Sequence, residues 1–101
     1  MFQCELRFNQ AKAEDMGYSA DNLYKTVDKI MVSEGLKKVK EGLYVDETAE
    51  TNKHTVRLTY LLAHCPQVVH FCNYLDITDP IEGSEGNIAC DLEKYRQYVK
   101  L

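Results

Sequence analysis

Side chains capable of acid–base chemistry occur in two segments of this chain that have strand-like patterns. Residues 2–9 alternate apolar with polar, which puts Glu5 on the polar side of an extended chain. In residues 67–78, His70 and Tyr74 fall on one side of a second extended segment. A carboxylate, an imidazole and a phenol can transfer the protons that attack by an RNA 2′-hydroxyl requires. If the two segments are neighbouring strands, we predict Glu5, His70 and Tyr74 as catalytic residues.

Binding positions are predicted on the same polar face. The guanidinium of Arg7 would hold a phosphate there. The predicted binding residues are Arg7, Lys40, Tyr44, Cys72 and Asp76. A sheet that is covered on one side shows a mixed polar face in any case, so an ordinary solvated surface or a dimer interface is the competing interpretation.

Neighbouring histidines and cysteines raise two further kinds of chemistry. His64-Cys65 and His70-x-Cys72 contain zinc-ligand types, but their spacing matches no common zinc pattern, so we predict no metal site. The Cys72 thiol would become a nucleophile if His70 or Glu5 activated it, and an inert buried thiol is the alternative. The chain has no phosphate-binding glycine loop, and we predict no cofactor.

The composition is that of an ordinary globular domain. The 101 residues suit one domain, residues 1–101, with 45% hydrophobic and 28% charged side chains. A formal net charge of −4 argues against a protein that binds nucleic acid mainly through phosphates. The four cysteines form no CxxC pair, and the chain shows neither an export signal nor an apolar run that would span a membrane. We therefore expect a cytoplasmic protein with reduced thiols.

A helix is predicted over residues 19–34. Ser19 is a favourable N-cap residue, and apolar residues that include Leu23 and Val27 recur at helical spacing after it. Gly35 follows the apolar stripe, where it suits a left-handed C-terminal cap.

Alternation and turn residues define the other elements. Residues 53–65 have leucines at helical spacing but also an alternating β-branched stretch, and we favour a helix that ends before Pro66. Gly42 indicates a bulge or a close approach of another backbone within a strand. Strands are predicted over residues 2–9, 36–46, 67–78 and 87–90, polar loops over 10–18 and 47–52, and a short helical tail after Asp91.

The order of these elements indicates an α+β fold of the ferredoxin-like, βαββαβ type. Right-handed crossovers would place both main helices on one face of an antiparallel sheet, with the first strand in its centre. A short C-terminal helix would complete the domain. The other face of the sheet would then stay open for a partner or a substrate.

A glycine–aliphatic step and a glycine-x-tyrosine strand follow the predicted helix, as Gly35-Leu36 and Glu41-Gly42-Leu43-Tyr44. This stretch resembles the virulence-associated protein D family, which is similar to the small CRISPR-associated ferredoxin-like nucleases. The resemblance implies a homodimer with endoribonuclease or toxin-type activity. The family has an aspartate at the end of the first strand, its favoured catalytic position, whereas residues 5–9 here contain none.

The seven tyrosines and the acidic charge favour a protein-binding surface over a nucleic-acid surface, because tyrosine is enriched among interface anchors. We therefore predict a small protein-interaction or regulatory module that forms a homodimer or binds a protein partner. The missing aspartate leaves its catalytic activity open. The alternative is an endoribonuclease of the virulence-associated protein D type that binds RNA on the polar sheet face.

Overall fold

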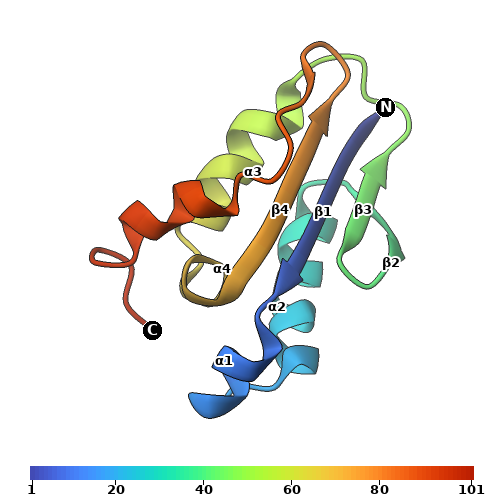
Figure 1. Ribbon diagram of the computed structural model, residues 1–101. Helices are drawn as coiled ribbons and strands as arrows, with labels where there is room; N and C mark the ends of the chain where they lie inside the picture. The colour runs from blue at the N-terminus through green and yellow to red at the C-terminus, as the bar shows by residue number, and fades with distance from the viewer.

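Strand β1 (Phe2–Phe8) runs through the centre of a five-stranded sheet (Figure 1). The computed structural model describes the whole chain, residues 1–101. The strand order is β2-β3-β1-β4-β5, and each neighbouring pair is antiparallel. The protein is therefore an α+β protein with an antiparallel sheet, as predicted. The other strands are β2 (Lys37–Lys40), β3 (Leu43–Asp46), β4 (Cys72–Asp79) and β5 (Gly83–Ser84).

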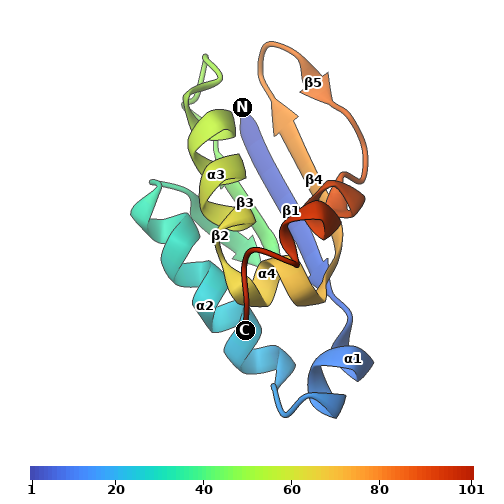
Figure 2. The same cartoon turned by 90° about the vertical axis from the view of Figure 1, so that its left-hand side faces the viewer.

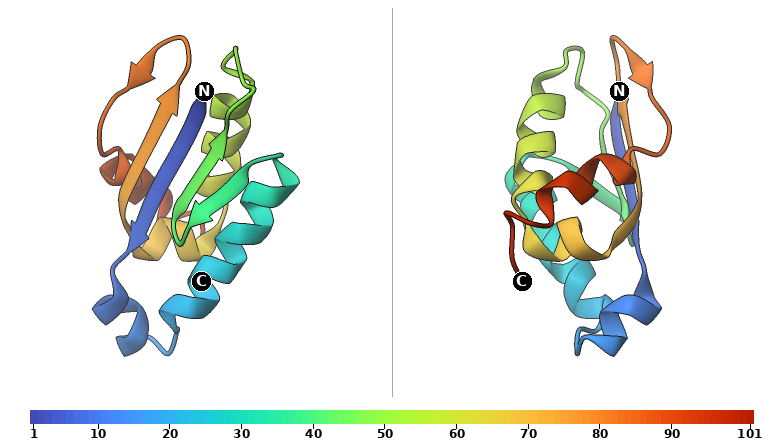
Figure 3. Two further views of the ribbon diagram at one scale, coloured as in Figure 1. Left: turned by 90° about the vertical axis from the view of Figure 1, so that its right-hand side faces the viewer. Right: turned by 60° about the vertical axis from the view of Figure 1, so that its left-hand side comes forward.

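Helices cover one face of this sheet and leave the other face bare. Helices α2, α3, α4 and the 3-10 helix η1 lie on the covered side, and α1 lies beyond the end of β1 (Figure 2). The left-hand view of Figure 3 shows the bare side. No helix has both the length and the apolar character that a membrane crossing needs. The helices are α1 (Gln10–Asp15), α2 (Ala20–Ser33), α3 (Lys53–Ala63), α4 (Pro66–Phe71) and η1 (Ala89–Tyr95).

Strand β1 has the two sides that its alternation predicts. Phe2, Cys4 and Leu6 are fully buried beneath the helices, whereas Arg7 on the opposite side is exposed. Full burial of a phenylalanine or leucine side chain stabilises a fold by about 1.5–3 kcal/mol, so β1 contributes strongly to the core.

Helix α2 confirms the predicted helix and its cap. The Ser19 hydroxyl oxygen accepts a hydrogen bond from the Asn22 amide at 3.2 Å, which satisfies one of the free donors of the first turn. Its apolar stripe, which includes Leu23 and Met31, is buried in the core. Gly35 follows with a φ of 84°, in the left-handed conformation expected of a C-terminal cap.

The segment 53–65, whose pattern fits both a helix and a strand, forms helix α3, as predicted. Leu58 and Leu62 in α3 are fully buried against the sheet, while Val56 and Tyr60 point to solvent. Burial of the leucine stripe therefore outweighs the β-branched composition of this segment. Pro66 follows the end of α3 and also begins the next helix, because it occupies the first turn of α4. The N–H that proline lacks would have no partner within a helix at this position, so no hydrogen bond is lost.

The prediction of one strand over residues 36–46 was wrong, because the segment folds into a hairpin of β2 and β3. Gly42 forms the turn with a φ of 81°, and a Cβ atom added there would lie 2.4 Å from the Leu6 carbonyl oxygen. A residue with a side chain would clash with β1 at this point. The close backbone approach expected of this glycine is therefore confirmed, but it occurs at a turn and not at a bulge in a longer strand.

Two loop and strand boundaries also differ from the prediction. The segment 10–18 contains α1, and the Asn9 side-chain oxygen caps it by accepting a hydrogen bond from the Lys12 amide at 3.1 Å. The predicted strand over 87–90 is absent, because the edge strand is β5 and η1 begins at Ala89.

Candidate functional site

The bare face of the sheet brings together side chains from all its strands. Directly paired residues of antiparallel strands point to the same side, and Glu5 pairs with Leu43 in β3 and with Asp76 in β4. We call this surface the open face. Its members, from the register of the four strand pairs, are Gln3, Glu5, Arg7, Lys37, Lys40, Leu43, Val45, Tyr74, Asp76, Thr78 and Ser84.

Arg7 links Glu5 to Tyr74 on the open face. Its Nη2 atom donates a hydrogen bond to Glu5 Oε2 at 3.0 Å, and this bond raises the pKa of the guanidinium above its usual value. Its Cζ atom lies 4.4 Å from the centre of the Tyr74 ring, which is a cation–π distance. The pairing of Arg7 with Tyr74 across β1 and β4 produces this contact.

Asp76 adds a second carboxylate beside Glu5. The two residues are directly paired, and the Ser84 hydroxyl of β5 donates a hydrogen bond to Asp76 Oδ1 at 2.5 Å. The side of the open face formed by β1, β4 and β5 therefore carries two carboxylates and one guanidinium.

Lysines occupy the opposite edge of the open face. All four residues of β2 are exposed; Lys37 pairs with Val45 and Lys40 pairs with Leu43. Lys38 points to the helical side instead, where its Nζ atom lies 2.9 Å from Asp28 Oδ2. The open face thus has a basic edge at β2 and an acidic region at β1 and β4.

The structure places predicted residues Glu5, Arg7, Tyr74 and Asp76 together, with Lys40 on the same face across the sheet. It places His70 elsewhere. His70 lies in α4, where its Nε2 atom is 2.6 Å from the Val99 carbonyl oxygen. The expected position of this imidazole beside Glu5 and Tyr74 was wrong, because the strand begins only after α4.

Cys72 and Tyr44 also lie off the open face. A register shift between Arg7 and Phe8 pairs Cys72 with Phe8, on the helical side. Cys72 is buried there, and burial raises the pKa of its thiol to about 11, which disfavours a thiolate nucleophile. Tyr44 is fully buried, and its hydroxyl donates a hydrogen bond to Asp28 of α2.

The open face offers fixed charges on a broad surface. The Glu5 carboxylate accepts a hydrogen bond from Arg7, and no imidazole faces it. The chain has no group of three His, Cys, Asp or Glu side chains arranged to hold a metal ion. The catalytic roles of Glu5 and Tyr74 stay predictions, while the arrangement of charges suits recognition of a complementary surface.

Some members of the open face were not predicted from the sequence. Lys37, Leu43 and Val45 belong to it because β2 and β3 fold back on each other. Ser84 belongs to it because β5 extends the sheet beyond β4. The only local signal for the first group is the glycine at 42, whose left-handed φ makes the hairpin turn.

Comparisons of the chain with protein-family models, with curated proteins and with solved structures found no match.

Proposed function

We propose that this chain is a small interaction module of ferredoxin-like fold that forms a homodimer through its open face. The order β2-β3-β1-β4, with β1 in the centre and helices on one side, supports the ferredoxin-like assignment, and β5 is an added edge strand. The observation that carries the proposal is the separation of charge across the open face.

The charges are self-complementary for one direction of the dimer axis. A two-fold axis parallel to the strands, midway between two facing sheets, places β2 of one copy over β4 of the other. Lys40 then lies opposite Asp76 of the partner, with Lys37 beside it opposite Thr78, and the reverse contacts form by symmetry. An axis across the strands would instead stack lysine on lysine. Charge therefore selects the first arrangement.

The centre of the open face is less polar than its edges. Leu43 of β3 lies between the lysine edge and the acidic region and is only partly buried within one chain, whereas Val45 beside it is already buried. An apolar centre with a charged rim is the usual anatomy of a protein interface. A second copy would cover Leu43 and Tyr74, which are both partly exposed in the monomer.

The edges of the sheet favour this face-to-face contact over strand addition. The outer edge of β2 carries lysines and a register shift between Lys38 and Lys40, and both features oppose pairing with another strand. The other edge strand, β5, has only two residues. Association therefore has more surface available on the open face than at either edge.

The test is the molar mass of the protein by light scattering at micromolar concentration. We expect twice the chain mass of 11.6 kDa for the parent and 11.6 kDa for the variant Lys37→Glu/Lys40→Glu. The matched control is Lys25→Glu/Lys29→Glu, which makes the same charge change on exposed positions of α2. A monomeric parent, or equal loss of the dimer in both variants, contradicts the proposal.

The second candidate function is the endoribonuclease. It is favoured by the presence of Arg7, Lys37 and Lys40 on the same face as Glu5 and Tyr74, since cations there would bind phosphates. An RNA-cleavage assay, with and without divalent metal, tests it. Cleavage that Glu5→Gln abolishes and that His70→Ala leaves intact supports it, because His70 lies off the open face. Intact RNA under both conditions contradicts it.

A further inference from the structure

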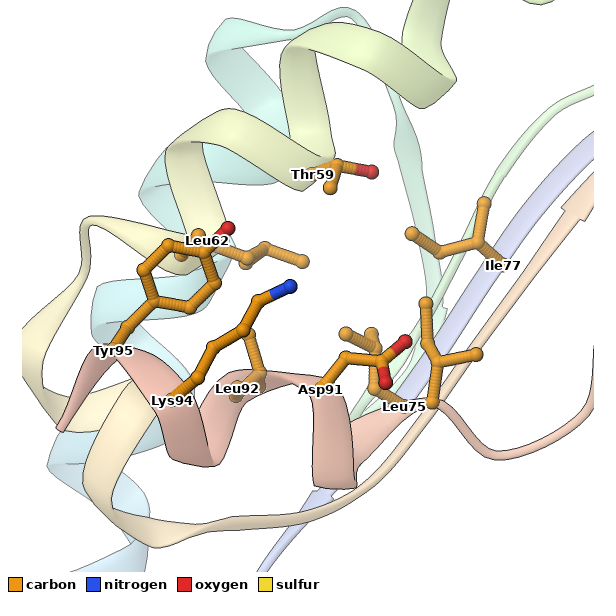
Figure 4. Close-up of a pocket in the computed structure, with 10 residues that line it drawn as sticks. Thr59, Leu62, Leu75, Ile77, Asp91, Leu92, Lys94 and Tyr95 are labelled. Carbon is orange, nitrogen blue, oxygen red and sulfur yellow. The ribbon is translucent and has the colours of Figure 1, made fainter.

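A hollow lies between α3, β4 and η1, on the helical side of the sheet (Figure 4). It has a volume of about 140 Å³, and most of the side chains around it are apolar. The apolar lining residues are Leu62, Ala63, Leu75, Ile77, Ile88, Leu92 and Tyr95. A dry engineered cavity of about 150 Å³ binds benzene, so this hollow has room for an apolar group of that size.

Three polar side chains, Thr59, Asp91 and Lys94, also line the hollow, and we call the part that they border its mouth. Figure 4 shows the Lys94 ammonium reaching into the space between Leu62 and the Asp91 carboxylate. A ligand whose apolar end fills the hollow would thus present its polar end to these side chains. An apolar pocket with a few polar groups that fix orientation is the usual form of a small-molecule site.

A second, polar hollow of about 250 Å³ continues from this mouth. The two share Thr59, Ile77, Ile88 and Asp91, and the second is also lined by Asp79, Glu82 and Glu85. The joint opening therefore has four carboxylates against the single ammonium of Lys94.

Three of these carboxylates lack a cationic partner. Glu82, Glu85 and Asp91 take part in none of the ion pairs of the chain. Asp79 is different, because its carboxylate accepts hydrogen bonds from the Thr55 hydroxyl and from the Ile81 amide at 2.8 and 2.7 Å. The uncompensated negative charge at the mouth favours a cation and disfavours an anion.

From the apolar hollow and its acidic mouth, we propose that this site binds a small amphiphilic primary amine, with an aromatic or branched aliphatic group in the hollow and the ammonium near Asp91. The site lies on the helical side of the sheet, away from the open face. Its occupancy is therefore independent of the proposed dimer, and the chain of 101 residues can be tested in either state.

The test uses phenethylamine as the probe, with phenylacetate and 2-phenylethanol as its anionic and neutral counterparts. Backbone and methyl NMR signals are followed during titration. We expect saturable shifts centred on Ile88, Leu92 and Tyr95 with the amine, weaker binding of the alcohol, and no saturable shift with the acid. Equal binding of the acid and the amine overturns the proposal, as does the absence of a saturable shift with the amine at millimolar concentration.

Two substitutions separate the apolar and the charged contributions. Ala63→Phe fills the hollow and should abolish binding of the amine and the alcohol. Asp91→Asn, at an exposed position that does not support the core, should weaken the amine about fivefold and leave the alcohol unchanged. Asp21→Asn in α2 is the matched control and should change neither affinity. Unchanged amine affinity in Asp91→Asn overturns the proposal even if Ala63→Phe fails to fold.

Discussion

The guanidinium of Arg7 lies over the ring of Tyr74, with 4.4 Å between its Cζ atom and the ring centre. The same guanidinium donates a hydrogen bond to Glu5, so one cation connects neighbouring strands on the bare side of the sheet. This contact brings three side chains of two strands together on the open face, while the Arg7 side chain stays 59% exposed. The three side chains belong to the acidic region of the open face.

We predict that the ring of Tyr74, and not its hydroxyl, couples to Arg7. Tyr74→Phe should leave the urea midpoint of unfolding unchanged, because the cation–π contact needs only the ring. Tyr74→Leu should lower the midpoint slightly. When Arg7 is also replaced by Met, the urea midpoints of Tyr74→Phe and Tyr74→Leu should differ less than they do when Arg7 is present. An equal difference between the two midpoints with and without Arg7 would show that the contact has no energetic role.

Gly42 is predicted to be the glycine least tolerant of substitution. Gly42→Ala combines the left-handed φ with a Cβ atom 2.4 Å from the Leu6 carbonyl oxygen, and should cost about 2–5 kcal/mol of unfolding free energy. Gly17→Ala is the control, since its φ is also positive but no atom lies within 4 Å of the added Cβ. That variant should cost about 1–2 kcal/mol, and equal losses in both variants would rule out the clash.

Acid should destabilise the protein partly through Asp46. A hydrogen bond from the Thr48 hydroxyl at 2.6 Å and a second contact with His54 Nε2 at 2.7 Å hold the pKa of the Asp46 carboxyl well below its usual range. Because the folded pKa lies below the unfolded value of about 3.9, the stabilisation is present above that pH and is lost as the pH falls further.

The measurement is the melting temperature at a series of pH values from about 2 to about 6, the range in which carboxylates titrate. We expect the parent to lose stability below about pH 4 more steeply than Asp46→Asn does. Asp21→Asn, in the exposed first turn of α2, is the comparison and should follow the parent curve. Identical acid slopes for the parent and Asp46→Asn would contradict the assignment.

One thiol of the four should react quickly in the folded protein. Cys90 is exposed, whereas Cys4, Cys65 and Cys72 are buried, and burial raises the pKa of the Cys4 and Cys72 thiols. Titration with a thiol reagent near neutral pH should show one fast phase, which Cys90→Ser removes, and the other thiols should react after unfolding. Fast reaction of Cys72 would restore it as a candidate nucleophile.

The parts of the fold that were predicted correctly depend on local patterns. The alternation of Phe2, Cys4 and Leu6 and the capped stripe that follows Ser19 each lie within one element. The hairpin at Gly42 was missed because a single glycine is compatible with a bulge or a turn, and only its contact with β1 distinguishes them. Helix α4 was missed because Val69 and Phe71 continue the alternation of Leu75 and Ile77, so residues 67–78 have the pattern of a single strand.

The candidate site was predicted in part for the same reasons. Glu5 and Arg7 share a face of β1, and Tyr74 and Asp76 share a face of β4, so alternation brings them together once the strands pair. Cys72 deviates because the register shifts next to Phe8, which changes the side to which it points. Such a shift depends on the partner strand and leaves no trace in the local sequence.

The most direct test of the proposed homodimer is a charge exchange between two variants. Lys37→Glu/Lys40→Glu makes both regions of the open face acidic, and Glu5→Lys/Asp76→Lys makes both basic, so neither should associate with itself. Light scattering should give 11.6 kDa for each variant alone and twice that mass for an equimolar mixture. If both variants are folded and their mixture stays at 11.6 kDa, dimerisation through the open face is contradicted. This conclusion holds whatever the measured mass of the parent protein.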